Sequence, residues 1–550
     1  MLGPTLTLLL PLIACAQLNV LPLPTTLTSE PGCLILSPSL SFLPTGPAAT
    51  DPYLLAAFAR FTAALASHAR RGESVQPCPA PPAGPPLASI AVAVAAPRAA
   101  PHPALGDDES YALSLAPGAA STLTAPTVWG AMRALETLSQ LVSAEGAPDA
   151  APPPPRLLIP AGAVRVQDAP RFGHRGLMID TGRAFLPLPT LLATLDAMAA
   201  VKLNVLHWHG SDDQAFPLQS DVWPHLTLGA MQAPSRTHTY SAADVAAVVA
   251  AASARGIRVM AELDVPGHST SWFAGYPALR TQCQDTGEFG APMDPTLNST
   301  YDFLAALFRE VGERFPDAWQ HVGGDEVQGS CWLNNSGVVA FMMEHGIPNT
   351  AQLQLYFETR LVGLLPAGKR GVIWEGNSGA LNAYPPGVVV NVWKEAHGNL
   401  TVMEQLVRDG FDVLYTTPDW YLDYPHLATG YDYHINGEGQ WQFVHSVDPL
   451  FNTTLTPSQQ RKVLGGEVCM WSPYEDATSF FPTVFPRAAA VAERLWSAAG
   501  ARVDEPVALG ARMLALRCRM VARGIPAAPT SYGGSCPNAW APAYVPPYEL

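Results

Sequence analysis

The feature that most constrains the fold is a repeated alternation of short apolar segments and helical stretches after Arg171. This alternation is typical of βα units arranged around a parallel sheet. Eight parallel strands with intervening helices close into a barrel, so the fold class is predicted to be α/β with a (β/α)8 TIM barrel. The eight apolar segments are 176–180, 203–208, 257–263, 319–323, 371–374, 388–393, 412–417 and 463–471.

The region before the barrel has a different composition, rich in Pro and Ala. Residues 87–95 and 110–116 have strand patterns, and residues 127–142 have the spacing of an amphipathic helix. The proline run 152–155 indicates an extended connection, because consecutive prolines continue neither a helix nor a central strand. These patterns predict a smaller α/β domain that precedes the barrel.

The predicted domain boundaries follow from these changes of pattern. The smaller α/β domain covers residues 18–170, and the catalytic barrel with a C-terminal extension covers residues 171–550. A chain of 550 residues is long enough for a barrel and a companion domain.

The first residues resemble a targeting segment. Residues 5–14 are apolar, and Ala14-Cys15-Ala16 before Gln17 has the small-x-small pattern of a signal-peptidase site, which predicts a signal peptide over residues 1–17. A buried N-terminal strand is the alternative reading. Sequons begin at Asn298, Asn334, Asn399 and Asn452. Together these features predict a glycoprotein of the secretory pathway, delivered to a lysosome or vacuole or outside the cell.

Charge and hydropathy exclude two classes of partner. The net charge is −15, with 31 Lys and Arg against 46 Asp and Glu, whereas nucleic-acid binding requires basic faces. After the first residues no apolar run reaches the roughly 18 residues that cross a bilayer. The sequence therefore predicts neither a nucleic-acid partner nor a membrane span.

Polar and aromatic residues follow the predicted strands at their C-terminal ends, the edge where barrel enzymes place their active sites. A barrel core does not require acids and aromatic residues at so many strand ends, so one shared pocket is predicted. In chain order they are Asp180, Arg183, His207, His209, Asp212, Asp264, His268, Asp325, Glu326, Trp374, Trp393, Trp420, Tyr421, Asp423 and Trp471.

The most specific local motif is HVGGDEV at 321–327, in which two glycines precede the adjacent acids Asp325 and Glu326. In a continuing strand the two side chains would face opposite ways, so both reach one pocket only if the chain leaves the ladder. Two close carboxyls raise the pKa of one of them, and glycoside cleavage needs one protonated acid and one stabilising negative group. By the motif alone, a solvated acidic turn remains an equal alternative.

Several segments together resemble the β-N-acetylhexosaminidases of glycoside hydrolase family 20. The resemblance covers the barrel region, and 127–142 resembles the end of the family's N-terminal domain. The matching barrel segments are 174–188, 203–218, 261–269, 321–327, 465–471 and 486–497.

The resemblance implies an exo-acting β-N-acetylhexosaminidase that removes terminal, non-reducing β-linked N-acetylglucosamine or N-acetylgalactosamine from a glycan or glycoconjugate. In that family the substrate's acetamido oxygen is the nucleophile and the configuration is retained. Glu326 would be the general acid and base, and Asp325 would orient the acetamido group. The implied substrate-binding residues are Arg183, Asp212, Asp264, His268, Trp374, Trp393, Tyr421, Asp423 and Trp471. Neither a cofactor nor a metal is implied.

This resemblance also assigns supporting roles. Asp264 and His268 would lie beside the acid pair, where an acid–histidine contact tunes the pKa of Glu326. Ser472-Pro473 stands where the family usually has Gly-Glu, so a ligand to a sugar hydroxyl is missing and the preference between gluco and galacto epimers is open. Glu475 is the nearest candidate to replace it.

Of the eight cysteines, seven follow Cys15. The family spacing implies three disulfides, with Cys469 reduced and buried, although six cysteines allow fifteen pairings and the assignment rests on the resemblance. The implied pairs are Cys33 with Cys78, Cys283 with Cys331 and Cys518 with Cys536. Because members of the family are often dimers, a homodimer is expected.

Two other functions remain open at this stage. An inactive carbohydrate-binding relative would keep the pocket but lose the acid pair, which is intact here. A metal-dependent deacetylase would use the cluster of His207, His209, Asp212 and Asp213.

Overall fold

The barrel is formed by eight parallel strands that close in the order β10-β13-β14-β15-β16-β17-β18-β9. Each strand overlaps one of the eight predicted segments, so the predicted barrel is confirmed. The strands are β9 (His174–Asp180), β10 (Val205–His209), β13 (Arg258–Glu262), β14 (Trp319–His321), β15 (Arg370–Trp374), β16 (Val389–Val392), β17 (Asp412–Tyr415) and β18 (Val463–Met470).

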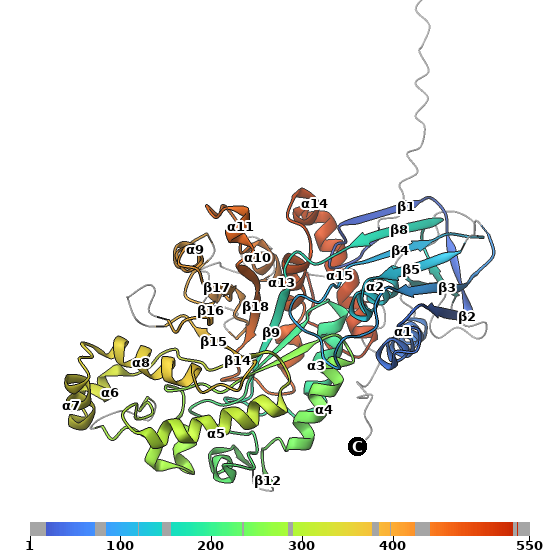
Figure 1. Cartoon of the computed structure of the whole chain (residues 1–550). Helices are drawn as coiled ribbons and strands as arrows, with labels where there is room; N and C mark the ends of the chain where they lie inside the picture. The colour runs from blue at the N-terminus through green and yellow to red at the C-terminus, as the bar shows by residue number, and fades with distance from the viewer. Residues whose placement is uncertain are drawn as a thin grey trace, which may run out of the picture.

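This arrangement comes from a computed structural model (Figure 1). It describes residues 18–71, 84–118, 120–145, 156–233, 236–283, 290–376, 384–396, 398–423, 440–531 and 536.

Helices connect most of the barrel strands and bury their apolar faces against the outside of the barrel. Between β15 and β16 the described residues contain no helix, and residues 377–383 lie outside the description. Among the described helices, none is both long and apolar enough to cross a bilayer. The helices of this half are α3 (Leu188–Ala200), α4 (Ala242–Ser253), α5 (Asn298–Arg314), α6 (Gly329–Leu333), α7 (Ser336–Glu344), α8 (Thr350–Val362), α9 (Thr401–Arg408), α10 (Gln440–Ser446), α11 (Pro457–Gln460), α12 (Phe480–Val484), α13 (Arg487–Trp496), α14 (Ala501–Asp504) and α15 (Pro506–Ala522).

The interior of the barrel has three layers that differ in polarity. The layer at the N-terminal ends of the strands is apolar and consists of Val205, Met260, Trp319, Val372, Val389 and Leu414. The layer at the C-terminal ends contains Met178, Trp374 and Cys469. Between them lie His207, Glu262, His321, Asn391 and Glu467, which are all fully buried. Packing alone does not require charged groups at such positions, so the middle layer needs its own explanation.

Gly176 on β9 makes room for one of these charges. It pairs with Glu467 across the junction of β9 and β18. A Cβ atom at position 176 would lie 2.5 Å from the Glu467 side chain. A residue without a side chain is therefore required where the first and last strands of the barrel meet.

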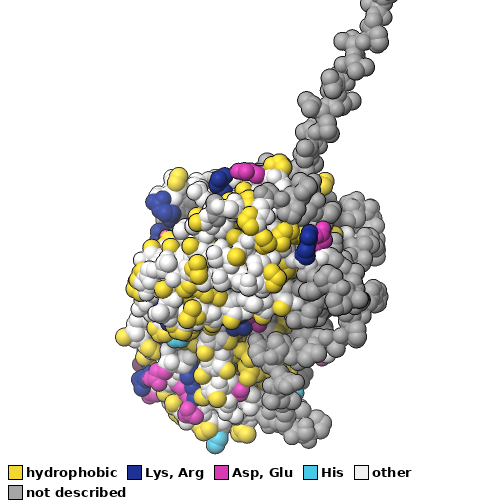
Figure 2. Space-filling view, turned by 90° about the vertical axis from the view of Figure 1, so that its right-hand side faces the viewer, with side chains coloured by type: hydrophobic (Ala, Val, Ile, Leu, Met, Phe, Trp, Pro, Cys, Tyr) yellow, Lys and Arg dark blue, Asp and Glu magenta, His cyan; other side chains and the backbone are white. Residues whose placement is uncertain are grey.

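The N-terminal domain is an eight-stranded sheet in the order β1-β8-β4-β5-β3-β2-β7-β6. The helix α2 (Val128–Leu141), capped by Thr127, packs between this sheet and α3, beside α1 (Pro52–Arg71) (Figure 1). The side of the molecule formed by this domain shows few charged side chains among its coloured atoms (Figure 2). The strands are β1 (Thr26–Glu30), β2 (Leu34–Thr45), β3 (Leu87–Val94), β4 (Tyr111–Leu115), β5 (Ser121–Ala125), β6 (Ser143–Glu145), β7 (Arg156–Ile159) and β8 (Ala163–Asp168).

A buried ion cluster joins the two halves. Glu109 of the N-terminal domain accepts hydrogen bonds from Arg133 Nε at 2.7 Å and from Arg175 Nη2 of β9 at 2.8 Å. Burial alone would raise the pKa of Glu109, but the two guanidinium groups lower it below its usual value. Glu109 is therefore an ionised bridge between the domains.

We expect Glu109→Gln to lower the free energy of unfolding by about 3 kcal/mol, because it leaves two buried guanidinium groups without their counter-charge. Since the folded-state pKa of Glu109 is lowered, this stabilisation should be present above the unfolded-state pKa and disappear as the pH falls through the folded-state pKa. Denaturant unfolding at several pH values measures the loss. Glu145→Gln, which breaks the exposed pair with Arg156, should change stability by no more than about 1 kcal/mol. Equal effects of the two variants would contradict the bridge.

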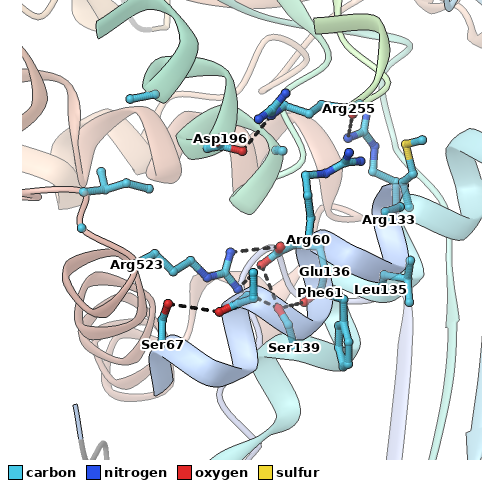
Figure 3. A pocket seen from close by; sticks show the side chains of 18 of the residues that line it. Arg60, Phe61, Ser67, Arg133, Leu135, Glu136, Ser139, Asp196, Arg255 and Arg523 are labelled. Atoms are coloured by element: carbon cyan, nitrogen blue, oxygen red, sulfur yellow. Dashed lines mark hydrogen bonds and ion pairs between the residues drawn. The ribbon is translucent and has the colours of Figure 1, made fainter. Parts of the chain in front are cut away.

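A cleft of about 370 Å³ lies at the same domain boundary, between α1, α2, α3 and α15 (Figure 3). Its cations are already engaged, since Arg523 pairs with Glu136 at 3.0 Å and Arg255 pairs with Asp196 at 2.7 Å. The cleft is therefore part of the contact between the domains.

Candidate active site

The backbone after β14 brings the two adjacent acids to one side of the barrel mouth. Gly323, Gly324 and Glu326 have φ values of 71°, 101° and 49°, so the chain leaves the strand geometry there. A Cβ atom on Gly323 would also lie 1.7 Å from Asp264 Oδ1. As a result, Asp325 Oδ2 lies 3.7 Å and Glu326 Oε2 lies 3.3 Å from one atom, His268 Nε2. Both carboxylates therefore lie beside the same histidine, after the chain has left the strand.

The histidine between the two acids is held by a third acid. His268 has a φ of 48°, and its Nδ1 is hydrogen bonded to Asp212 Oδ1 at 3.1 Å, while the Asp264 carboxylate lies close to His268 and Asp325. Burial would lower the pKa of His268, but Asp212 and Asp325 raise it well above its usual value. The charged His268 in turn lowers the pKa of Glu326.

The expectation that pairing would raise the pKa of one of the two adjacent acids is not met by Glu326, because the contact with His268 outweighs repulsion between carboxylates. The raised pKa belongs to Asp264 instead. This side chain is buried, and both burial and the charge of Asp325 act against its ionisation. Its Oδ1 accepts a hydrogen bond of 2.9 Å from the N–H of Gly324, which fixes the turn that carries the acid pair.

Arg183 follows β9 and lies inside the site rather than in a surface ion pair. Its guanidinium contacts Asp180 at 3.1 Å and Asp212 at 2.8 Å, and lies 4.9 Å from the ring centre of Trp471. Burial would lower its pKa, but the two acids raise it. With 18% of its side chain exposed, Arg183 presents a fixed positive charge to the barrel mouth.

Aromatic rings surround this charge. The ring centres of Trp374 and Trp471 are 5.9 Å apart, and those of Tyr421 and Trp471 are 6.0 Å apart. Trp374 is only 1% exposed, so it forms the floor of the site rather than a wall. Trp393 is half-buried and donates from Nε1 to the carbonyl of Glu375. Flat apolar faces of this kind suit the C–H face of a pyranose.

Trp420 does not belong to this group. It is fully buried, its ring packs on Tyr415, and its Nε1 donates to the carbonyl of Val444 at 3.1 Å. The sequence placed it at a strand end correctly, but its side chain points into the core.

Two buried polar atoms at the site have no hydrogen-bond partner among the described residues: Asp325 Oδ1 and Asp423 Oδ1. Burial raises the pKa of Asp423 to about 6. Because buried polar atoms are normally hydrogen bonded, these two indicate a polar ligand. The site thus combines two converging acids, a fixed cation, aromatic faces and unpartnered polar atoms.

Comparison with known proteins identifies the family. Residues 172–499 match the family model described as glycosyl hydrolase family 20, catalytic domain. The chain belongs to glycosyl hydrolase family 20. Residues 20–141 match a second model of this group, described as beta-acetyl hexosaminidase like.

Relatives of known name agree with this family 20 assignment. The chain is 40% identical over 422 residues to beta-hexosaminidase subunit alpha of Mus musculus, covering 75% of this chain and 74% of the relative. It is 38% identical over 440 residues to beta-hexosaminidase subunit beta of Homo sapiens, covering 79% and 74%. The solved structure of Flavobacterium johnsoniae chitobiase superposes with a TM-score of 0.76 at 27% identity, covering 92% of this chain and 73% of that one.

The side chains of the alternative metal cluster do not converge in this family 20 barrel. His207 lies with Glu262 and His321, whereas Asp212 and Asp213 lie with His268. His209 bridges Glu262 and Asp212 through hydrogen bonds of 2.6 and 2.9 Å.

Two of the implied disulfides are present. Cys283–Cys331 ties the segment after β13 to α6, and Cys518–Cys536 closes the C-terminal extension. Cys469 is free and buried, as expected. The third implied pair, Cys33 with Cys78, involves a residue outside the described part of the chain, as does the predicted signal peptide over 1–17.

The predicted glycosylation sites and the divergent loop can also be placed. All four sequon asparagines are exposed, namely Asn298, Asn334, Asn399 and Asn452. In the loop that replaces Gly-Glu, Ser472 is buried and donates its N–H to Asp180, while Tyr474 is 92% exposed. Glu475 accepts a hydrogen bond of 3.4 Å from Thr483, and its use as a sugar ligand remains a prediction.

Sequence reasoning missed two buried acids, Glu262 and Glu467. Each stands in the middle of a strand pattern that is otherwise apolar or small, within RVMAE and LGGEVCM. An acid at an inward position of a buried strand is a detectable signal, because such a charge persists only when it is paired.

Proposed function

We propose that Glu326 is the general acid and base, and that Asp325 positions the substrate's acetamido group, in this exo-acting β-N-acetylhexosaminidase of family 20. The observation that carries the proposal is the convergence of both carboxylates on His268 Nε2, at 3.3 and 3.7 Å, beside the unpartnered Asp325 Oδ1. An inactive relative would have no use for this arrangement, and both acids are present.

The proposed reaction has two steps. In the first, the acetamido oxygen of the substrate bonds to the anomeric carbon while the glycosidic bond breaks, and Glu326 gives its proton to the leaving oxygen. Asp325 stabilises the positive charge that develops on the acetamido nitrogen. In the second, Glu326 takes a proton from water, which opens the oxazolinium ring from the opposite face, so configuration is retained.

The remaining residues would bind the sugar. Arg183 and Asp423 offer a charged donor and an acceptor to sugar hydroxyls, and Asp423 Oδ1 is unpartnered. Trp393, Trp471 and Tyr421 would enclose the acetamido group. His268 keeps the pKa of Glu326 low in the free site, so the acid form needed for the first step is favoured at acidic pH.

The test is release of 4-nitrophenol from its β-N-acetylglucosaminide and β-N-acetylgalactosaminide between about pH 4 and 7, for wild type and Asp325→Asn. Wild type should act on at least one sugar and the variant should be strongly impaired, because the acetamido group loses its negative partner. The ratio between the two sugars reports the epimer preference left open by Pro473. Equal turnover by wild type and variant would refute the role of Asp325.

The cellular setting and assembly belong to the same proposal. The two disulfides and four exposed sequons support passage through the secretory route, since disulfides form in oxidising compartments. We infer delivery to a lysosome or vacuole or to the outside of the cell, with a glycan or glycoconjugate as substrate. A homodimer remains an expectation from the family.

A further inference from the structure

The charged middle layer of the barrel is connected to the acid pair by alternating carboxylates and imidazoles. At its inner end, Glu467 contacts His174 Nε2 at 2.6 Å and His207 Nδ1 at 2.8 Å. His207 Nε2 lies 3.0 Å from Glu262 Oε2. From Glu262 the contacts continue through His209 and Asp212 to His268, as described above.

His209 links the two parts of this series of carboxylates and imidazoles. Its two ring nitrogens are both hydrogen bonded to carboxylates, Nδ1 to Glu262 Oε2 at 2.6 Å and Nε2 to Asp212 Oδ2 at 2.9 Å. A neutral imidazole has one N–H, so one nitrogen would face an ionised oxygen lone pair to lone pair. Both bonds form only when His209 carries two protons. The two acids indeed raise its pKa well above the usual value against the effect of burial.

The surroundings of Glu262 favour its ionised form. It is fully buried, and its Oε1 accepts a hydrogen bond of 2.6 Å from Trp374 Nε1 while its Oε2 is bonded to His209. Burial would raise the pKa of Glu262, but the neighbouring histidines lower it well below its usual value. The same Trp374 ring forms the floor of the site, so the carboxylate also fixes the floor.

We propose that Glu262 is a positioning residue of the reaction, because its buried negative charge keeps His209 doubly protonated, Asp212 ionised and His268 an imidazolium directed at Glu326. The proposal rests on the assignment of Glu326 as proton donor. Without the charge of Glu262, the doubly protonated form of His209 would be less favoured. The imidazolium form of His268, and with it the positive charge beside Glu326, would then be less favoured as well.

Other charged or titratable groups also lie close to this series of carboxylates and imidazoles, and they influence the charges of its members. Around Glu262 they are His207, His209, Asp264, His321, Glu467 and Cys469. Around His268 and Glu326 they are Arg183, Asp212, Asp213, Asp264, Asp325 and Lys394. None of them except His209 contacts both Glu262 and Asp212 among the described residues, so the coupling between these two acids passes through His209.

The experiment compares the pH dependence of kcat/KM for wild type, Glu262→Gln and Glu404→Gln. A weaker charge on His268 lets the pKa of Glu326 rise, so the basic limb should move to higher pH by roughly half a unit or more in Glu262→Gln, with a lower kcat. Glu404 is also buried, but it pairs with Arg408 of α9 outside the barrel interior, so its variant should keep the wild-type limb.

A second variant and a direct measurement test the proposal even if Glu262→Gln does not fold. Glu467 lies further along the series from Asp212. Glu467→Gln should therefore move the basic limb of the kcat/KM profile in the same direction, but by less. In the wild-type enzyme labelled with ¹⁵N-histidine, His209 should remain an imidazolium between about pH 5 and 8, where an ordinary histidine loses its proton.

The outcomes separate this inference from the assignment of the acid. An unmoved limb in folded Glu262→Gln, or a neutral His209 at pH 7, would overturn it and leave Glu262 a purely structural residue. If Glu326→Gln proved fully active, the proposed function itself would fail, whatever Glu262 does.

Discussion

Glu326→Gln is expected to lower kcat by roughly 10²- to 10⁴-fold on a substrate whose leaving group is a sugar alcohol, because the amide keeps the shape of the side chain but has no acidic proton. With 4-nitrophenol as leaving group the loss in the first step should be smaller, since that oxygen leaves without protonation. Steady-state rates on a β-linked N-acetylglucosamine disaccharide and on the aryl glycoside give the comparison.

The matched control for this substitution is Glu344→Gln, at the exposed end of α7, which should leave both rates unchanged. Near-normal turnover of the disaccharide by Glu326→Gln would show that another residue supplies the proton.

Replacing the 2-acetamido group of the substrate by a hydroxyl is expected to lower kcat/KM by at least about 10³-fold, because the nucleophile is then missing. Well-oriented intramolecular groups reach effective molarities of roughly 10⁵–10⁸ M, which an outside water cannot match. The measurement compares the 4-nitrophenyl β-N-acetylglucosaminide with the plain β-glucoside at equal pH.

Asp325→Asn sharpens this comparison. If Asp325 acts only on the acetamido group, the substitution should reduce hydrolysis of the N-acetyl substrate and leave the residual glucoside rate nearly unchanged. Equal losses on both substrates would assign Asp325 a different role, and efficient glucoside hydrolysis by wild type would exclude the acetamido group as nucleophile.

The barrel was predictable because each strand is a short apolar segment whose end carries polar residues. Asp325, Glu326 and Arg183 could be placed for the same reason, since parallel strands end at one edge of the sheet. The direction of a side chain at a strand end was harder to predict. Trp420 and Tyr421 are adjacent, yet one packs into the core and the other faces the site.

Pairings within the site could not be read from the sequence. The partner of His268 depends on a left-handed backbone at that residue, a conformation that is uncommon for residues other than glycine and that a strand or helix pattern does not reveal. Glu262 was missed because a strand pattern records apolarity, whereas its burial depends on partners from four other strand positions: His207, His209, His321 and Trp374.

The junction of β9 and β18 has a consequence for synthesis of the enzyme. The side chain of Glu467 occupies the space above Gly176 and binds His174, a residue 293 positions earlier in the chain. A nascent chain cannot close the barrel or complete its charged middle layer until β18 has left the ribosome. Until then β9 exposes an unpaired edge, so the growing polypeptide has its greatest need of chaperones before the last strand arrives.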